Sequence, residues 1–431
     1  MNSNKKRIAF YTLGCKLNFS ETAEISRDSD RHGFRKVNFK DEADIYVINT
    51  CSVTENADKD ARKLIRKAKR RNSNSIIVLI GCYAQLNPDE ISAIDGVNLI
   101  LGAKEKFNVF EQLAQIDGNS STKIIKSDIN HNHSFKPSYS ILERTRSFLK
   151  IQDGCDYTCS FCTIPLARGE SRSDTIVNTI KKAQEIARTD TREIVLTGVN
   201  TGDFGKKNSE TFFDLLRQLN QINEIDRIRI SSIEPNLLTD QIIEYCLNSN
   251  KLMPHFHMPL QSGSNKILKS MRRRYKRDLY SNRVSKIKSM NSDACIGTDV
   301  IVGFPGESDN DFLETLNFLK DVDISYLHVF KYSERSNTDA IYLGDSIPKK
   351  ARAERSKRLH ILSDKKQRYF YSQFIGESRP VLFEYKKNGK LVGHTDNYIP
   401  VRIDGNDEMI NSIQNINFTK NYGEFLEGVL L

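Results

Sequence analysis

The sequence lacks long hydrophobic runs. No apolar stretch approaches the roughly 20 residues that a membrane-spanning helix requires. The apolar stretch at residues 8–13, which follows a basic N-terminus, is too short for a signal peptide. Internal repeats and low-complexity segments are missing as well. We therefore expect a cytoplasmic protein that has no membrane partner.

Cysteine is scarce, at 8 of 431 residues, and a cytosolic chain of this size has no need of disulfide bonds. Grouped cysteines in such a chain are first interpreted as metal sites. Cys246 lies in a helical pattern and Cys295 begins an apolar strand pattern, so we interpret both as core residues. The other six cysteines remain candidate ligands.

Negative charge is in deficit. The chain has 65 Lys and Arg residues against 55 Asp and Glu residues, which gives a formal net charge of +10. This moderate excess of positive charge favours a polyanionic partner over a small neutral one.

The order of strand and helix signals predicts an α/β protein with three domains. Alternating strands and helices in residues 1–117 predict a doubly wound α/β domain. Residues 118–140 are polar and show little periodicity, so we interpret them as a linker. Residues 141–372 contain about six further strand–helix units, which fit a partial or full barrel. Short alternating strands and turn signals in residues 373–431 predict a small antiparallel barrel of about five strands.

Individual elements are predicted from apolar runs and from capping residues. In the first domain the strands are expected at residues 7–12, 44–49, 75–80 and 97–101. A helix is expected over residues 20–32 with Ser20 as its N-cap, and a charged helix over residues 54–71. In the second domain the strands are expected at residues 148–151, 193–196, 227–230, 255–258, 294–302 and 326–330. A long basic helix is expected at residues 349–371.

Cys155, Cys159 and Cys162 form the spacing CxxxCxxC with Phe161 before the last cysteine, just after the first strand of the predicted barrel. Three thiolates bind three irons of a [4Fe–4S] cluster and leave the fourth iron open. That iron can chelate the amino and carboxylate groups of S-adenosylmethionine (SAM), and an electron from the cluster then cleaves SAM to a 5′-deoxyadenosyl radical. The alternative is a zinc site in which Asp156 or a distant His is the fourth ligand.

Cys15, Cys51 and Cys82 are far apart in sequence, but each follows the end of a predicted strand. Because parallel strands bring their carboxyl ends to one edge of the sheet, we expect the three thiols to meet there. Gly14 and Gly81 precede two of them and permit a close backbone approach. The pattern predicts a second three-cysteine [4Fe–4S] cluster, with three buried apolar thiols as the alternative.

Several segments occur in an order that resembles the methylthiotransferase family of radical-SAM enzymes over almost the whole chain. The matching segments are LGCKLN, NTCSVT, GCYAQ, CDYTCSFCTIPLARGESRS, HFHMPLQSGS, MRRRY, DVIVGFPGE and GHTDNY. The resemblance implies an N-terminal methylthiotransferase domain, a radical-SAM partial barrel and a C-terminal TRAM barrel. It also implies two [4Fe–4S] clusters, SAM as cofactor, and a tRNA substrate.

Within the family, LGCKLN and TGVNTGDFG are similar to the bacterial enzymes that modify N6-threonylcarbamoyladenosine beside the tRNA anticodon. The hydrogen on C2 of adenine is unactivated, so its replacement by a methylthio group requires radical chemistry. A reduced flavodoxin or ferredoxin-type protein would supply the electron. The alternatives are isopentenyladenosine in tRNA or a ribosomal-protein aspartate as substrate. An iron–sulfur electron carrier or a plain RNA-binding protein would be a different class.

Contacts to SAM are expected from residues near the cysteine motif and at strand ends. Phe161 is placed to pack near the adenine, and Gly198 and Asn200 follow a barrel strand and are candidates to meet the methionyl amino group. Glu234 and Gln261 also lie at strand ends. Ordinary loop structure is the alternative for each of these residues.

Contacts to tRNA are expected from basic and aromatic side chains. The candidates are Arg272, Arg273, Arg274 and Tyr275. The basic helix at residues 349–368 is a further candidate, although a solvated helix face is the alternative. Tyr385, Tyr398 and Phe418 of the C-terminal barrel form a possible RNA platform.

Overall fold

The computed structural model describes residues 5–51, 55–116, 121–129, 132, 134–140 and 145–431. The chain forms two compact units that share the segment around residues 141–173. The first unit consists of Met1–Ser140, Phe148–Thr158 and Cys162–Ser173, and the second of Ile141–Ser147, Cys159–Phe161 and Asp174–Leu431. Among the described residues, no helix combines the length and the apolar character that crossing a bilayer takes.

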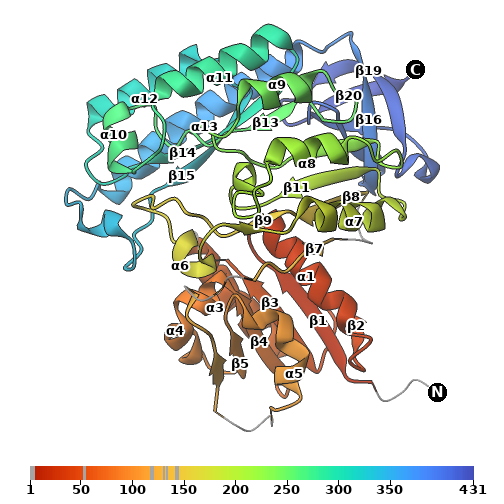
Figure 1. The fold of residues 1–431 in the computed structure, drawn as a ribbon, viewed down its shortest axis with the longest axis vertical. Coiled ribbons are helices and arrows are strands. Elements are labelled where there is room, and N and C mark those ends of the chain that lie inside the picture. The colour runs from red at the N-terminus through yellow and green to blue at the C-terminus, as the bar shows by residue number, and fades with distance from the viewer. Residues whose placement is uncertain (1–4, 52–54, 117–120, 130–131, 133, 141–144) are drawn as a thin grey trace. The chain divides into compact units, whose positions relative to one another are not determined.

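The first unit is built on a six-stranded parallel sheet in the order β2-β1-β3-β4-β5-β6 (Figure 1). Its strands are β1 (Arg7–Thr12), β2 (Arg35–Val37), β3 (Ile45–Thr50), β4 (Ile76–Gly81), β5 (Leu99–Leu101) and β6 (Lys123–Ile125). The strand order reverses at β1, so the carboxyl ends of β1 and β3 border the crevice in which doubly wound sheets bind ligands. The predicted doubly wound fold is confirmed.

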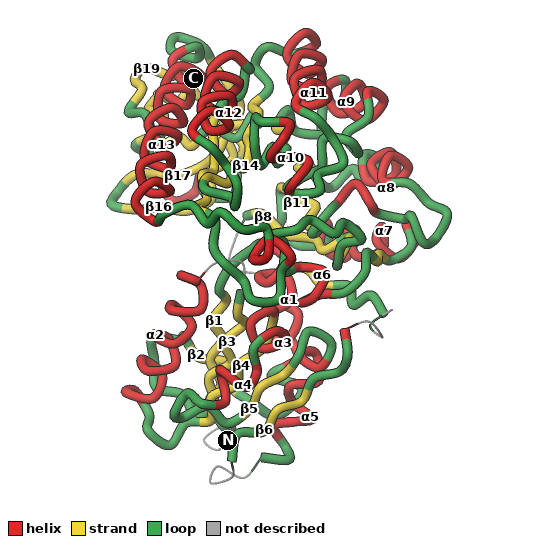
Figure 2. The backbone as a smooth tube through the Cα atoms, turned by 90° about the vertical axis from the view of Figure 1, so that its left-hand side faces the viewer, coloured by secondary structure: helices red, strands yellow, loops and turns green. Residues whose placement is uncertain are grey.

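Helices cover both faces of this sheet (Figure 2). The helices are α1 (Lys16–Asp28), α2 (Glu55–Arg71), α3 (Cys82–Leu86), α4 (Pro88–Ser92), α5 (Val109–Leu113) and the 3-10 helix η1 (Glu105–Asn108). Ile8, Val47 and Val78 pack in one core cluster with Ile25 of α1 and residues of α5. The alternate strand residues pack in the other cluster with α2, α3 and α4. Alternate side chains along each strand therefore pack into two different cores, as in a sheet buried on both faces.

Two expectations for this unit are wrong. Helix α1 begins at Lys16 with Cys15 as its N-cap, and Ser20 lies inside the helix, where its hydroxyl donates to the carbonyl of Leu17. The segment interpreted as a linker contributes β6, which pairs with β5 at the sheet edge. That strand is too short to show a period of two. The predicted first residue of α2, Thr54, lies outside the described residues.

Short strands complete the first unit. β7 (Ser138–Tyr139) pairs with residues 149–150 of β8 (Arg146–Lys150), and β9 (Gln152–Asp153) pairs with β10 (Arg172–Ser173), both antiparallel. Helix α6 (Ile164–Arg168) lies between β9 and β10 in the chain and packs against α3.

The second unit contains parallel strands alternating with helices, as predicted for a partial barrel. Its parallel strands are β11 (Glu193–Thr197), β12 (Arg227–Ile230), β13 (His255–His257), β14 (Cys295–Val302) and β15 (Tyr326–Lys331). The helices are α7 (Ile176–Ala187), α8 (Phe212–Leu219), α9 (Asp240–Leu247), α10 (Asn265–Ser270), α11 (Arg277–Met290), α12 (Asp309–Asp321) and α13 (Lys349–Ser372), with the 3-10 helices η3 (Thr201–Asp203) and η4 (Asp339–Tyr342). The side chains of Thr175, Thr211, Thr239 and Ser308 cap α7, α8, α9 and α12.

The C-terminal part of the second unit is a closed five-stranded barrel in the order β16-β17-β18-β20-β19, as predicted, except that β18 and β20 pair in parallel and not antiparallel. The strands are β16 (Ser378–Lys387), β17 (Lys390–Thr395), β18 (Pro400–Ile403), β19 (Ile413–Asn421) and β20 (Leu426–Leu430), with the 3-10 helix η5 (Asp407–Met409) before β19. Asn388 and Gly389 both have positive φ in the β16–β17 turn, as a type I′ hairpin requires. Phe370 and Phe374, at the end of α13, join the core of this barrel.

Arginines of the parallel strands bind the C-terminal barrel. Arg227 donates to the carbonyls of Pro380 (2.8 Å) and His394 (3.1 Å). Arg229 is buried, donates to the carbonyl of Asp396 (3.0 Å) and lies over the ring of Tyr398. The small barrel is therefore part of the same packed body as the strands of the second unit.

Candidate iron–sulfur and substrate site

The three N-terminal cysteines follow adjacent strands of the first sheet. Cys15 follows β1 and caps α1, Cys51 directly follows β3, and Cys82 directly follows β4 and begins α3. Cys15 is exposed, whereas Cys51 and Cys82 are buried. All three lie at the carboxyl edge of the sheet, the first two at its point of strand reversal.

The backbone between these cysteines is tightly packed. A Cβ atom on Gly14 would lie 2.5 Å from Cβ and 2.9 Å from Sγ of Cys51. Gly81, in front of Cys82, leaves equally little room beside Asn49 and Thr50, and both glycines have positive φ. Each of the two positions therefore requires glycine for two reasons: the backbone conformation has positive φ, and there is no room for a side chain.

A buried network of charges lies beside this cysteine edge. Glu21 accepts from Lys106 (2.6 Å), Lys150 (2.8 Å) and Arg168. Asp153 is also buried and pairs with Lys150 (2.7 Å) and Arg168 (2.9 Å). Burial disfavours the charged form of Glu21, but these three cations hold the pKa of its carboxyl far below its ordinary value.

Arg168 connects this network to the thiols. Burial lowers the pKa of Arg168, but Glu21, Cys82, Asp153 and Cys15 raise it well above its ordinary value. Burial raises the pKa of the Cys82 thiol, and Arg168 opposes that shift most strongly. A cation between two thiols stabilises their thiolate forms. Arg168 lies in the segment CDYTCSFCTIPLARGESRS, but no sequence pattern predicted a role for it.

The cysteines of the CxxxCxxC segment have polar donors nearby. In the first unit, Sγ of Cys155 accepts the backbone N–H of Tyr157 at 3.4 Å. In the second unit, Sγ of Cys159 accepts from Nη1 of Arg273 at 3.2 Å. Cys162 is partly buried. Donors to sulfur are the contacts that tune cluster-ligating thiolates.

The structure corrects two of the predicted RNA contacts. The side chain of Arg273 is 4% exposed, forms an ion pair with Glu234 and donates to the hydroxyl of Tyr275. Tyr275 is buried as well, and its hydroxyl donates to the carbonyl of Leu260 at 3.0 Å. Neither residue is accessible to a phosphate. Arg273 donates to the sulfur of Cys159, and the hydroxyl of Tyr275 accepts from Arg273. Arg272 and Arg274 are exposed.

The C-terminal platform is corrected in the same way. Phe418 is completely buried in the core of the small barrel. Tyr398 stacks on His394 and lies under Arg229, and Tyr385 is 48% exposed. In the basic helix, Arg352 and Arg355 are buried and pair with acidic residues. Periodicity in so short a barrel does not reveal which aromatic side chains point inward.

The predicted SAM contacts lie at or beyond the carboxyl ends of the parallel strands of the second unit. Phe161 is partly buried against Ile301 and Met271. Gly198 follows β11, and the amide of Asn200 donates to Asp203 at 2.9 Å. The backbone of Gln261, which has positive φ, pairs with β14. Glu234 is engaged by Arg273, as described above.

The two remaining cysteines are core residues, as predicted. Cys246 and Cys295 are each 2% exposed, and burial raises the pKa of each thiol to about 12. Such thiols are poor ligands and poor nucleophiles.

Comparison with known proteins agrees with this fold and these motifs. Residues 7–102 match a family described as Uncharacterized protein family UPF0004, and residues 149–319 match the Radical SAM superfamily. Two solved structures of the radical SAM methyltransferase TsrM from Kitasatospora setae have TM-scores of 0.53 and 0.54 at 11% and 10% identity. The alignments cover 76% and 75% of this chain, and 75% and 73% of the TsrM chains, and show the shared fold. The CxxxCxxC motif and the match over residues 149–319 thus define a radical-SAM enzyme, a class that implies a [4Fe–4S] cluster and SAM.

Relatives over nearly the full length define the family. The chain is 39% identical to the threonylcarbamoyladenosine tRNA methylthiotransferase MtaB of Bacillus subtilis, over 98% of this chain and 97% of the relative. It is 37% identical to MtaB of Aquifex aeolicus, over 94% and 98%. It is 32% identical to the tRNA-2-methylthio-N(6)-dimethylallyladenosine synthase of Sulfurimonas denitrificans, over 96% of each. The chain belongs to the methylthiotransferase family of radical-SAM enzymes.

Proposed function

We propose that this enzyme adds a methylthio group to C2 of N6-threonylcarbamoyladenosine beside the anticodon of tRNA. The observation that carries the proposal is the near-full-length similarity to enzymes named for this nucleoside, which exceeds the similarity to those named for dimethylallyladenosine. The three cysteines at one sheet edge support it, since sulfur transfer needs a site separate from the one that cleaves SAM.

Cys155, Cys159 and Cys162 are proposed to hold one [4Fe–4S] cluster, and Cys15, Cys51 and Cys82 a second. The donor sets fit such clusters, because each offers three thiols. The close approach of Gly14 to Cys51 and the cation Arg168 beside Cys82 and Cys15 support the second assignment. When bound, the first cluster supplies the electron that cleaves SAM.

The protein residues have separate tasks in this proposal. Arg273 orients Cys159 and is itself fixed by Glu234 and Tyr275. Arg168 is the cation that most strongly opposes the burial-raised pKa of the Cys82 thiol. Phe161, together with Gly198, Asn200 and Gln261, is proposed to bind SAM. Glu234 is proposed to act there as a residue that positions Arg273.

Partners and domains follow from the same function. A reduced flavodoxin or ferredoxin-type protein in the cytoplasm is the proposed electron donor. The exposed Arg272 and Arg274 and the exposed basic face of α13 are the proposed tRNA contacts. We propose residues 1–117 as the methylthiotransferase domain, 141–372 as the radical-SAM domain and 373–431 as a TRAM domain.

The experiment is nucleoside mass spectrometry of tRNA from cells that lack their own methylthiotransferase and express this chain. The 2-methylthio form of threonylcarbamoyladenosine should appear. A Cys15→Ala variant should abolish it and still form 5′-deoxyadenosine from SAM in vitro, whereas Cys159→Ala should abolish both products. Methylthiolation of isopentenyladenosine alone, or of a ribosomal protein alone, would contradict the proposed substrate but not the enzyme class.

A further inference from the structure

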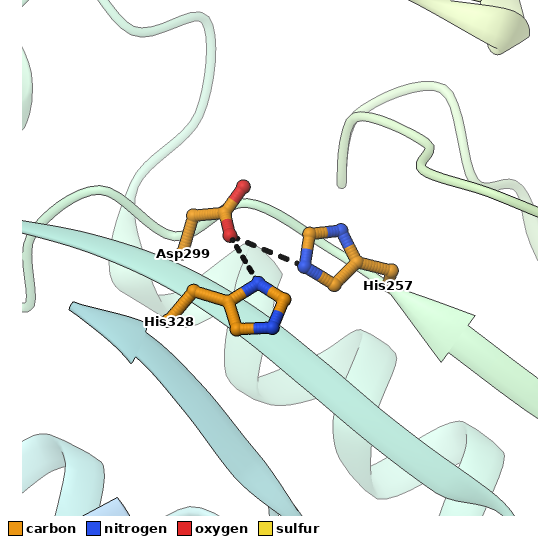
Figure 3. A group of neighbouring side chains, drawn as sticks. All are labelled: His257, Asp299 and His328. Atoms are coloured by element: carbon orange, nitrogen blue, oxygen red, sulfur yellow. Dashed lines mark hydrogen bonds and ion pairs between the residues drawn. The ribbon is translucent and has the colours of Figure 1, made fainter. Parts of the chain in front are cut away.

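His257, Asp299 and His328 form a polar cluster on the three adjacent strands β13, β14 and β15 (Figure 3). Nε2 of His257 and Nδ1 of His328 each lie 3.2 Å from Oδ1 of Asp299. The side chain of His257 is 11% exposed and that of His328 is 54% exposed, so the cluster is buried at one end and accessible at the other.

The cluster lies on the sheet face opposite to the helices. Residues alternate along β14, and Thr298 on the other face contacts Tyr280 of α11. Asp299 therefore shares its face with Gly297 on one side and Ile301 on the other. Ile301 belongs to the apolar cluster against which Phe161 of the CxxxCxxC segment packs. On this face of β14, the polar cluster therefore lies next to the apolar residues that Phe161 covers.

An aromatic layer closes the opposite side of the cluster. The ring of Tyr326 lies across β14 where a Cβ on Gly297 would come within 2.3 Å of it. Tyr326 also stacks against His255, and His255 contacts Tyr398 of the small barrel. The interior of the second unit is therefore filled up to Tyr326, and the three polar side chains form the next layer.

The charge state of Asp299 fixes how the two rings are presented. Burial disfavours its ionised form, but His257 and His328 hold the pKa of its carboxyl far below its ordinary range. Asp299 is therefore a carboxylate at neutral pH that accepts from Nδ1 of His328 and lies 3.2 Å from Nε2 of His257. A carboxylate that accepts from one ring nitrogen sets the orientation of the imidazole and leaves the other nitrogen for a ligand. In His328, the nitrogen turned away from Asp299 is Nε2 (Figure 3).

We infer that this cluster binds the acidic side chain of the substrate nucleoside, and this inference rests on the proposed function. Threonylcarbamoyl carries a carboxylate, a hydroxyl and a ureido group, whereas dimethylallyl carries only carbon and hydrogen. A layer of two imidazoles and a carboxylate has no partner in an apolar side chain, and burying it against one would cost the desolvation of its polar groups. It matches a side chain that offers both an acceptor and a donor, because His328 held between Asp299 and a substrate carboxylate would bind as the imidazolium and donate one N–H to each. His328 is the residue that recognises the carboxylate of the nucleoside side chain, and Asp299 is the residue that positions His328.

The test uses the full chain, reconstituted anaerobically, and two anticodon stem-loop RNAs that differ at one group. One RNA carries threonylcarbamoyladenosine with its free carboxylate, and the other carries the same nucleoside as its neutral methyl ester. The wild type should prefer the acid by about tenfold in kcat/KM, the size expected when a polar group in a site loses its partner. His328→Phe and His328→Gln should both lose that preference by falling about tenfold on the acid only.

The control is His32→Phe, an exposed histidine of the first unit, which should keep the preference of the wild type. Because His328 is itself exposed, its substitutions are expected to fold, and thermal unfolding checks this. If the His328 variants keep the preference for the acid, the inference is overturned. If the wild type modifies neither RNA, the proposed function fails instead. A metal-binding measurement gives a further outcome. If the chelator-treated wild type bound one equivalent of Co²⁺ and the His328 variants did not, the cluster would be a metal site and the inference would be overturned.

Discussion

Arg168 and Glu21 form a two-point ion pair in the interior of the first unit, with Nη1–Oε1 at 3.1 Å and Nη2–Oε2 at 3.2 Å. Arg168 also donates to Oδ1 of Asn18 at 2.6 Å. Glu21 and Asn18 belong to the helix that Cys15 caps, while Arg168 ends the helix that follows Cys162. The pair therefore ties a segment of each cysteine motif into one structure.

The first prediction concerns the stability of this pair. Glu21→Gln leaves Arg168, Lys106 and Lys150 buried without their shared carboxylate. Removing one partner of a buried ion pair costs about 3–5 kcal/mol. Urea unfolding of the protein should show a loss of this size, with the slope against urea unchanged.

The matched control is Asp28→Asn, which removes the partner of Arg31 in an exposed pair of 3.2 Å at the C-terminal end of the same helix. A surface pair contributes about 0–1 kcal/mol, so this variant should unfold near the wild-type midpoint. Equal losses in the two variants would show that the buried network is not what stabilises the first unit.

A second prediction concerns acid stability of the second unit. Glu193 is buried and accepts from Arg229 at 2.9 Å. Burial opposes ionisation, yet Arg229 lowers the pKa of Glu193 from 4.5 to about 2. The folded pKa is depressed, so the stabilisation is present in full above pH 4.5 and is lost as the pH falls toward 2. It amounts to roughly 3 kcal/mol, of which about 1 kcal/mol is lost by pH 3.5.

The measurement is the free energy of unfolding at pH 6, 4.5 and 3.5 for the wild type and Glu193→Gln. The variant should be less stable at pH 6, and its stability should fall less steeply with acid. Parallel curves for the two proteins would mean that Glu193 does not titrate in this window.

Sequence patterns were sufficient for the fold and for the position of three cysteines after the ends of strands, because both depend on local signals. The buried strands have uninterrupted apolar runs, and Cys15, Cys51 and Cys82 follow three of them. The Asn388-Gly389 turn identified a hairpin, because positive φ at both positions is a property of those residue types.

Side-chain partners between distant segments were not predictable. Arg273 and Arg274 are neighbours in one basic run, yet one is buried against Cys159 and the other is exposed. His257, Asp299 and His328 come from three strands, and their meeting depends on strand register. A pattern of residue types carries neither the register nor the direction of an individual side chain.

A third prediction separates space from backbone strain at Gly14. Gly14→Ala would place a methyl group against Cys51, whereas Gly33→Ala has the same sign of φ with nothing within 4 Å. Both substitutions strain the backbone, but only Gly14→Ala should displace a ligand of the proposed second cluster. After reconstitution it should hold about half the iron of the wild type, because one of the two proposed clusters is lost. Gly33→Ala should hold the full amount, and equal iron in the two variants would argue against cluster binding at Cys51.

A fourth prediction concerns the two adjacent arginines. Arg274→Gln should weaken tRNA binding and reduce the slope of log affinity against log salt by about 1, since one phosphate contact is lost. Arg273→Gln should leave that slope unchanged and instead alter the spectrum of the SAM-cleaving cluster, because it removes the donor to Cys159. An unchanged spectrum, or a lower salt slope, in Arg273→Gln would contradict the assignment of this residue to the cluster.

The last prediction concerns the small barrel and its contribution to RNA binding. Removing it by truncation before Arg379 would expose Phe370 and Phe374 and leave Arg227 and Arg229 without their carbonyl acceptors. The truncated chain is therefore expected to aggregate, which size-exclusion chromatography would detect, and its loss of tRNA binding would carry no information.

Tyr385→Ser in the full chain is the informative variant, because this side chain is 48% exposed. Stacking of one base contributes about 1–3 kcal/mol, so tRNA affinity should fall by about fivefold or more with no change in the unfolding midpoint. Unchanged affinity would remove Tyr385 from the RNA-binding surface and leave the barrel as a closure for the second unit.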